Sequence, residues 1–144
     1  MWKKNVILAI LLSIGGGGYY LTSKTKEEKT NVKEDKMELK IVDTQEGTGS
    51  IVEKGDRLRV HYRGTLENGK QFDSSFDRGE PLEFTVGVGQ VIKGWDDGLL
   101  GLKVGGKRTI HIPAHLGYGS RGAGNAIPPN SNLIFDVELV EILK

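Results

Sequence analysis

The sequence predicts an α+β domain in which a curled antiparallel sheet of about five strands wraps around one short helix. Several segments alternate apolar and polar residues with the period of two that a half-buried strand shows, while only one segment has helical spacing. Because one helix covers only one face of a sheet, the sheet must curl around it to enclose a core. The 144 residues are enough for a single domain of this kind.

The first half of the domain reads as strands joined by tight turns. A first strand is expected around Leu39 and Ile41. Residues 57–63 then alternate cleanly, with apolar residues on one side and arginine or histidine on the other, which is typical of a half-buried antiparallel strand. Asn68-Gly69 follows and predicts a hairpin turn, and residues 82–86 alternate again.

The period changes in residues 91–100, where a short amphipathic helix is expected. Ile92, Trp95 and Leu99 are separated by three and four positions and therefore share one helix face. Gly101 is placed to end the helix. Strand periodicity returns in residues 107–112 and again in residues 132–143, which form the longest expected strand.

Residues 113–130 form a glycine-rich segment of 18 residues between the last two strands, predicted to have no regular structure of its own. Loops of this length inside a compact domain are usually functional or disordered. Because the segment carries Tyr118 and Ile127, a functional loop is favoured.

Residues 1–21 are expected to be a membrane anchor or a signal segment. Lys3 and Lys4 precede an uncharged stretch, residues 5–23, whose 19 residues approach the roughly 20 that a bilayer core needs. A cleaved secretory signal also begins with a basic region, but no small-residue cleavage site is evident. A buried hydrophobic helix is the third alternative. The anchor reading predicts a single-pass protein with its domain outside the cytosol, and the signal reading a secreted or periplasmic one.

Residues 22–37 are rich in charge and have one apolar residue, Val32, before Met37, so they are expected to be a polar spacer. The net charge of the chain is only +1, which gives no electrostatic argument for nucleic acid. There is no cysteine, and this excludes disulfides, thiolate metal sites and a cysteine nucleophile. The three histidines show no metal-ligand spacing, so neither a metal nor a cofactor is expected.

Six motifs in a fixed order make residues 38–144 resemble an FKBP-type peptidyl-prolyl cis/trans isomerase domain. They cover about three quarters of the chain. The motifs are VHYRG from Val60, ENGKQFDSS from Glu67, PLEF from Pro81, GQVIKGW from Gly89, GYG from Gly117 with IPPN from Ile127, and LIFDVEL from Leu133. The resemblance implies a half-wrapped sheet around one helix with a ligand pocket between them.

The resemblance also implies which residues form that pocket. The tryptophan of the helix, Trp95, corresponds to the floor, and Tyr118 to the loop tyrosine that reaches bound ligand. Asp73 corresponds to the carboxylate beside the aromatic wall, and Phe84 to an aromatic position near the pocket. The remaining wall positions are Tyr62, Phe72, Val91, Ile92, Ile127 and Phe135. Leu82 and Ala126 depart from the family pattern, because an aromatic and a larger aliphatic residue are frequent there.

The expected activity is rotation about X–Pro bonds of polypeptide clients, with Asp73, Tyr118, Trp95 and Phe72 as its catalytic residues. The same resemblance implies that macrolides of the tacrolimus or rapamycin kind bind in the pocket. A chaperone or binding module that uses the pocket without turnover is the alternative, and a membrane scaffold that docks a partner is a weaker one. The spacer is too polar for a dimerisation helix, so a monomeric domain is expected.

Overall fold

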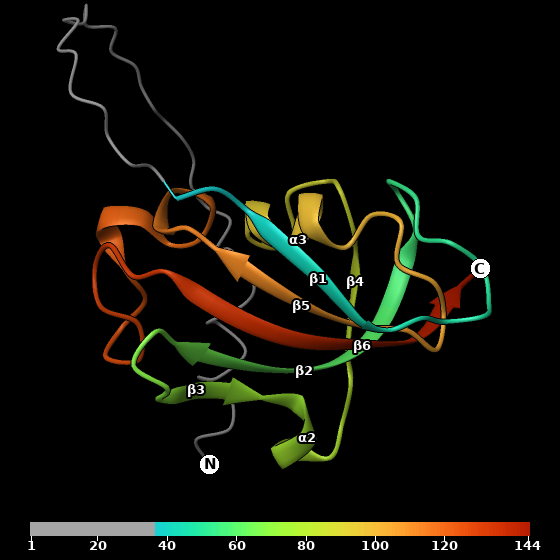
Figure 1. Ribbon diagram of the computed structural model, residues 1–144, viewed down its shortest axis with the longest axis horizontal. Helices are drawn as coiled ribbons and strands as arrows, with labels where there is room; N and C mark the ends of the chain where they lie inside the picture. The colour runs from blue at the N-terminus through green and yellow to red at the C-terminus, as the bar shows by residue number, and fades with distance from the viewer. Residues whose placement is uncertain (1–36) are drawn as a thin grey trace, which may run out of the picture.

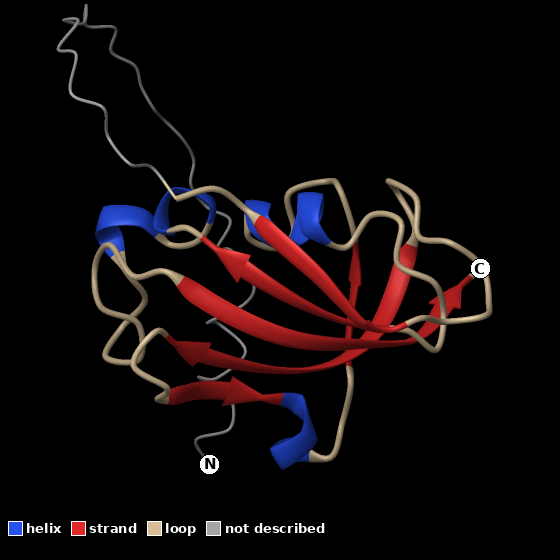
Figure 2. Ribbon diagram, viewed as in Figure 1, coloured by secondary structure: helices blue, strands red, loops and turns tan. Residues whose placement is uncertain are grey.

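The computed structural model describes residues 37–144, and the anchor or signal and almost all of the spacer lie outside them. Six strands form one antiparallel sheet (Figures 1 and 2). They are β1 (Lys40–Gln45), β2 (Arg57–Leu66), β3 (Gln71–Ser74), β4 (Leu82–Thr85), β5 (Lys107–Ile112) and β6 (Leu133–Leu143). The helices are α2 (Ser75–Arg78) and α3 (Lys93–Gly98), with 3₁₀ turns η1 (Ala114–Leu116) and η2 (Gly119–Arg121).

The sheet has the order β1-β5-β6-β2-β3, and β4 pairs with the other end of β2. β2 and β6 are the two long central strands. β3 pairs with the second half of β2 and β4 with its first half, so α2 lies in a segment that leaves the sheet edge and returns to it. Figure 1 shows this excursion below β2, with α2 at its far end.

The alternation predicted from the sequence separates a buried face of the sheet from an exposed one. In β2 the alternate residues Leu58, Val60 and Tyr62 are fully buried, and in β6 the row that includes Leu133 and Phe135 is buried as well. On α3, the predicted face of Ile92, Trp95 and Leu99 has no exposed surface. These residues pack against Ile110 and Ile112 of β5. The core therefore lies between α3 and one face of the sheet.

Arg108 fixes the end of α3 to the sheet. Its side chain points inward from β5 and is 8% exposed. Its Nη1 donates to the carbonyl oxygens of Gly98 and Leu100, each at 2.9 Å, where the helix leaves its last carbonyls without helical partners. The other side of the guanidinium pairs with the carboxylate of Asp43 on β1. One cation thus connects the edge strand, its neighbour and the helix.

The predicted fold class is confirmed, and the structure differs from the prediction in three details. The sheet has six strands where about five were expected, because β3, the short segment before α2, is a strand in addition to those that were expected. One helix was expected, but α2 also forms. Ser74 caps it, with Oγ accepting from the backbone N–H of Asp77 at 3.2 Å. The segment 113–130 is not without structure, since it contains η1 and η2.

Within residues 37–144, no helix is long and apolar enough to pass through a lipid bilayer.

We predict that Asp43→Asn weakens the fold at neutral pH and flattens its acid sensitivity. The hydrogen bond from Arg108 lowers the pKa of Asp43 below its ordinary 3.8. Such an acid stabilises the fold above the pKa it has when unfolded, and that stabilisation disappears as the pH falls through the lower, folded value. Because the Asp43 side chain is 53% exposed, the expected loss at pH 7 is less than about 1 kcal/mol.

Urea unfolding at pH 7 and at pH 3, followed by circular dichroism, measures this effect. Glu80→Gln, at an exposed position, is the control for loss of one surface charge. If Asp43→Asn and Glu80→Gln reduce the free energy of unfolding equally at both pH values, the Asp43–Arg108 pair contributes nothing specific.

Candidate functional site

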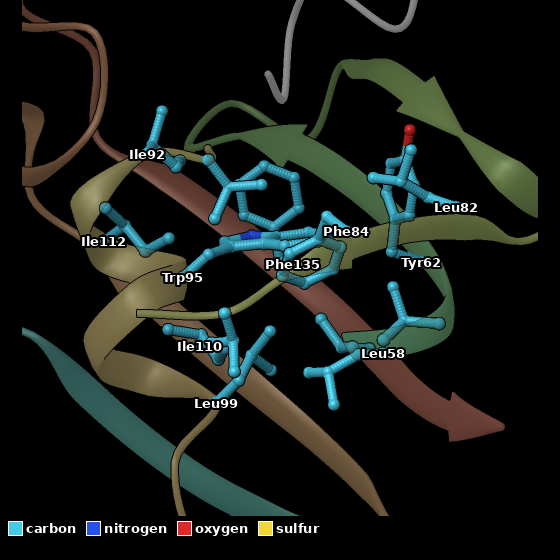
Figure 3. Packing of buried hydrophobic residues seen from close by; sticks show 14 of the residues in the cluster. Leu58, Tyr62, Leu82, Phe84, Ile92, Trp95, Leu99, Ile110, Ile112 and Phe135 are labelled. Atoms are coloured by element: carbon cyan, nitrogen blue, oxygen red, sulfur yellow. The ribbon is translucent and has the colours of Figure 1, made fainter. Parts of the chain in front are cut away.

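Five aromatic side chains from five different elements form one connected cluster in the core. Trp95 of α3 lies at its centre, with ring centroids 5.3 Å from Tyr62 of β2, 5.4 Å from Phe84 of β4 and 5.2 Å from Phe135 of β6. Phe72 of β3 extends the cluster through an edge contact with Phe135 at 5.5 Å. Figure 3 shows the indole enclosed by Phe84, Phe135 and Tyr62. The structure therefore brings five of the six predicted aromatic residues together in one cluster.

The absence of a side chain at Gly64 leaves room for two rings of the aromatic cluster. Gly64 lies on the inner face of β2, opposite Phe135. A Cβ atom there would lie 2.6 Å from ring atoms of both Phe135 and Phe72. The Phe72–Phe135 pair thus occupies the space that a side chain at residue 64 would fill.

The aliphatic residues of the predicted site pack around these rings. Val91 and Ile92 have no exposed surface, Ile127 is 1% exposed and Leu82 is 8% exposed, and all four belong to the same buried cluster. Val91 and Ile92 come directly before α3, whereas Ile127 comes from the loop between β5 and β6. Ala126, the second departure from the family pattern, is exposed.

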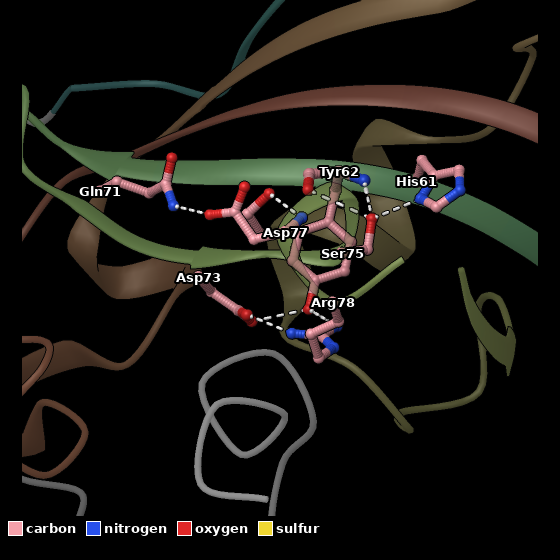
Figure 4. Close-up of polar contacts among 8 residues, drawn as sticks. His61, Tyr62, Gln71, Asp73, Ser75, Asp77 and Arg78 are labelled. Atoms are coloured by element: carbon pink, nitrogen blue, oxygen red, sulfur yellow. Dashed lines mark hydrogen bonds and ion pairs between the residues drawn. The ribbon is translucent and has the colours of Figure 1, made fainter. Parts of the chain in front are cut away.

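A buried polar cluster lies beside the aromatic one and shares Tyr62 with it (Figure 4). The Tyr62 hydroxyl donates to Asp73 Oδ2 at 2.6 Å, and Arg78 Nη1 donates to Asp73 Oδ1 at 2.7 Å. Arg78 Nη2 closes the ring by donating to the Tyr62 hydroxyl oxygen at 2.8 Å. The Asp73 side chain has no exposed surface, and that of Arg78 is 14% exposed. Both oxygens of a fully buried carboxylate are therefore hydrogen-bonded.

The electrostatics of the cluster follow from burial. Burial raises the pKa of Asp73, against the hydrogen bonds from Tyr62 and Arg78, which act to lower it. Burial also raises the pKa of Tyr62, and the negative charge of Asp73 raises it further. Burial alone would lower the pKa of Arg78, but its bonds to Tyr62 and Asp73 raise it overall. Tyr62 is thus a protonated hydroxyl and Arg78 a permanent cation.

Tyr118 approaches the same region from the loop between β5 and β6. It comes directly before η2, is partly buried and packs against the core cluster. Burial raises the pKa of its hydroxyl, and the negative charge of Asp73 raises it further. The Tyr118 hydroxyl is therefore a hydrogen-bond donor at any physiological pH, within electrostatic range of Asp73.

Ser75 supports Tyr62 from behind. Its buried hydroxyl oxygen accepts from the backbone N–H of Tyr62 at 2.7 Å and lies 2.8 Å from Nδ1 of His61 (Figure 4). The His61 ring in turn stacks on Phe76 with centroids 4.7 Å apart. His61 thus contacts two residues of α2, Ser75 and Phe76. The two neighbouring serines have different roles. Ser74 caps α2, whereas Ser75 connects α2 to β2.

Sequence reasoning missed Arg78. A single arginine five residues after Asp73 carries no periodic signal, and only the turn of α2 brings it back over the carboxylate.

One polar atom of the aromatic cluster is unpaired: among the described residues, Nε1 of the buried Trp95 finds no hydrogen-bond acceptor.

Comparison with known proteins decides the family. A family model described as FKBP-type peptidyl-prolyl cis-trans isomerase matches residues 49–140. The chain is 59% identical over 104 residues to an FK506-binding protein of Neisseria meningitidis serogroup A, and the match covers 72% of this chain and 95% of that protein. The chain belongs to the FKBP-type peptidyl-prolyl isomerase family.

A eukaryotic relative and a solved structure support the same family assignment. FK506-binding protein 2 of Dictyostelium discoideum is 56% identical over 108 residues, covering 75% of this chain and 81% of that protein. The crystal structure of AtFKBP13 superposes with a TM-score of 0.69 at 48% identity and covers 73% of this chain and 93% of that one. The expected family and enzyme class are confirmed. The roles of individual residues in this FKBP domain stay predictions.

We predict that Arg78→Met destabilises the FKBP domain by about 3 kcal/mol, because removing one partner of a buried ion pair leaves the other charge buried and unpaired. Without the guanidinium the pKa of Asp73 rises further, so the variant loses more of its stability than the wild type as the pH increases. Urea unfolding between pH 4 and pH 8 measures both effects.

Arg121→Met, which removes an exposed arginine, is the matched control and is expected to change the free energy of unfolding by less than about 0.5 kcal/mol. Equal stabilities for the Arg78→Met and Arg121→Met variants would show that Arg78 does not balance the Asp73 carboxylate.

Proposed function

We propose that this chain catalyses cis/trans rotation about X–Pro bonds, with the proline bound against the aromatic cluster around Trp95, beside Asp73 and Tyr118. The observation that carries the proposal is that five aromatic rings adjoin a hydrogen-bonded carboxylate and protonated tyrosine hydroxyls. Family membership supports the same reaction.

The chemistry of the reaction suits such a site. Rotation about an X–Pro bond has a barrier of about 18–20 kcal/mol, because the planar amide has partial double-bond character. No covalent bond breaks and no proton moves, so neither a nucleophile nor a general base is required. The twisted amide is less polar than the planar one, and an apolar environment therefore favours the transition state over the ground state.

Exposure indicates the side from which the polypeptide approaches. Trp95, Tyr62 and Phe135 have no exposed surface, whereas Phe72 and Tyr118 are partly exposed. We propose that a bound proline enters the cluster between these two residues and approaches Trp95 from that side. The side chains of Phe84, Val91, Ile92, Ile127 and Leu82 would form the surrounding wall.

The polar residues have positioning roles in this proposal. The Tyr118 hydroxyl is held protonated and donates to the carbonyl oxygen of the peptide segment at the proline. Asp73, bonded to Tyr62 and Arg78, gives the site a fixed negative charge near the bound carbonyl carbon. A million-fold acceleration corresponds to about 8 kcal/mol, which desolvation of the amide and one or two hydrogen bonds can supply.

The ligand proposal extends to macrolides. The curated relatives are named FK506-binding proteins, and we propose that tacrolimus and related macrolides occupy the same aromatic site here and compete with proline-containing polypeptides. The spacer is too polar for a dimerisation helix, so the domain is proposed to act as a monomer.

The decisive experiment measures cis/trans exchange of an X–Pro peptide by the full-length chain, with tacrolimus as competitor. Tyr118→Phe and Asp73→Asn are expected to lower kcat/KM about tenfold each, which corresponds to about 1.4 kcal/mol of transition-state stabilisation. Asp77→Asn, an exposed aspartate on α2 outside the cluster, is the charge-matched control and should retain wild-type kcat/KM.

The outcomes separate the candidate functions. Exchange that is inhibited by tacrolimus and weakened in Tyr118→Phe supports the isomerase. Tacrolimus binding without exchange would favour the binding module, and a folded chain that shows neither activity would favour the membrane scaffold.

For residues 1–37 we propose a membrane tether, residues 5–23, that holds the domain outside the cytosol on the polar spacer. Support comes from the sequence alone: the 19 uncharged residues follow Lys3 and Lys4, and charge resumes at Lys24.

Expression of the full-length chain, followed by alkaline extraction of membranes, tests the tether. We expect the uncleaved chain in the membrane pellet and digestion of the domain by protease added from outside the cytosol. A shortened chain in the extracellular or periplasmic fraction would instead identify a cleaved signal, and an uncleaved chain that is fully extracted would contradict both readings.

A further inference from the structure

We propose that Asp96 is a positioning residue of the isomerase site, because its buried carboxylate clamps the loop that carries Val91 and Ile92. The inference rests on the proposed function, in which those two residues form the wall beside Trp95. No sequence motif pointed to Asp96, and its role follows from its contacts.

The clamp consists of two short hydrogen bonds across the loop between β4 and α3. The backbone N–H of Gly87 donates to Asp96 Oδ1 at 2.7 Å, and the N–H of Gly89 donates to Oδ2 at 2.9 Å. Asp96 is 9% exposed, so both carboxylate oxygens are used in a largely dry environment. Hydrogen bonds of this charged kind are about twice as strong as neutral ones.

The conformation of the loop explains why a carboxylate is needed. Gly87 and Gly89 have φ of 85° and 83°, a left-handed conformation that favours glycine. Between them Val88 points outward and is 53% exposed. This turn thus directs two N–H groups inward, while the side chain of Val88 points away from the core. Without an acceptor at residue 96, both N–H groups would lose their protein partner.

Asp96 holds the far end of the segment as well. Its own backbone N–H donates to the carbonyl oxygen of Ile92 at 3.1 Å, and the N–H of Trp95 donates to the same oxygen at 2.9 Å. The side chain therefore fixes the loop at residues 87 and 89, while the main chain fixes it at residue 92. Val91 and Ile92, which have no exposed surface, lie between these points. Any shift of the loop moves the proposed wall relative to the indole beside Asp96.

Asp97 offers a matched control in the next position of the same helix. Its carboxylate is 43% exposed and pairs only with Lys93, across one turn on the surface. The full-length wild type is compared with Asp96→Asn, Asp96→Glu and Asp97→Asn. An asparagine amide can accept only one of the two bonds, because its NH₂ group faces a second donor, whereas a glutamate keeps both acceptors.

We expect Asp96→Asn to lower kcat/KM for an X–Pro peptide about tenfold and to lower the hydrogen-exchange protection of the Gly87 and Gly89 amides by at least about tenfold. Protection of the Tyr62 amide in β2 reports global unfolding and should change less. Asp96→Glu should recover most of the activity and protection, and Asp97→Asn should match the wild type.

The proposal is overturned if Asp96→Asn keeps wild-type kcat/KM and wild-type protection at both glycines. It is also overturned if all amides, Tyr62 included, lose protection equally, since Asp96 would then only stabilise the fold. A folded wild-type chain that does not accelerate cis/trans isomerisation of the X–Pro peptide would overturn the proposed function. The hydrogen-exchange protection of the Gly87 and Gly89 amides would still decide whether Asp96 clamps the loop.

Discussion

A single six-residue helix has to close one face of a six-stranded sheet, and most of the structure depends on how Trp95 achieves this. The indole is the largest side chain with no exposed surface, and it contacts rings from β2, β4 and β6 at once. A helix this short has little intrinsic stability, so packing has to hold it in place. The aromatic cluster supplies the packing at its middle and Arg108 supplies hydrogen bonds at its end.

The second constraint is the burial of Asp73 next to this apolar cluster. A buried carboxylate is unfavourable unless it is paired and hydrogen-bonded. Tyr62 and Arg78 meet that requirement from opposite sides, and Tyr62 belongs to both the polar and the aromatic cluster. The position of the charge is consequently tied to the position of the rings. A charge fixed in this way needs no reorganisation when a substrate binds, which is the condition for electrostatic stabilisation in a dry site.

The parts of the fold that could be predicted are those with a strong periodic signal. The alternation in β2, β5 and β6 and the three- and four-residue spacing of Ile92, Trp95 and Leu99 gave correct elements because burial imposes those periods. α2 escaped prediction because four residues are too few to show a helical period, and its start depends on one cap from Ser74. The same turn brings Arg78 to Asp73, so the partner of the predicted carboxylate was missed with it.

The site residues that could be predicted from the sequence are those in family motifs. Residues that act through one specific contact in the folded chain could not be predicted. Trp95, Tyr62, Phe72 and Asp73 stand in recognisable motifs, and the structure places them together. Asp96 directly follows Trp95 in α3, outside the quoted motif, and its partners are backbone N–H groups, which leave no mark in the sequence beyond two glycines. Contacts between a side chain and the main chain of a distant loop are set by tertiary structure alone.

Building such a site from core residues has a physical consequence. Since rotation about an amide bond requires no reactive group, the residues that favour the twisted amide are those that exclude water, and excluding water is also what stabilises the fold. Removing Trp95 would therefore leave a large cavity and destabilise the domain together with the site. Only groups at the boundary of the cluster, such as the hydroxyl of the partly buried Tyr118, can be removed without emptying the core. For this domain, loss of activity identifies a catalytic role only where the fold is shown to remain.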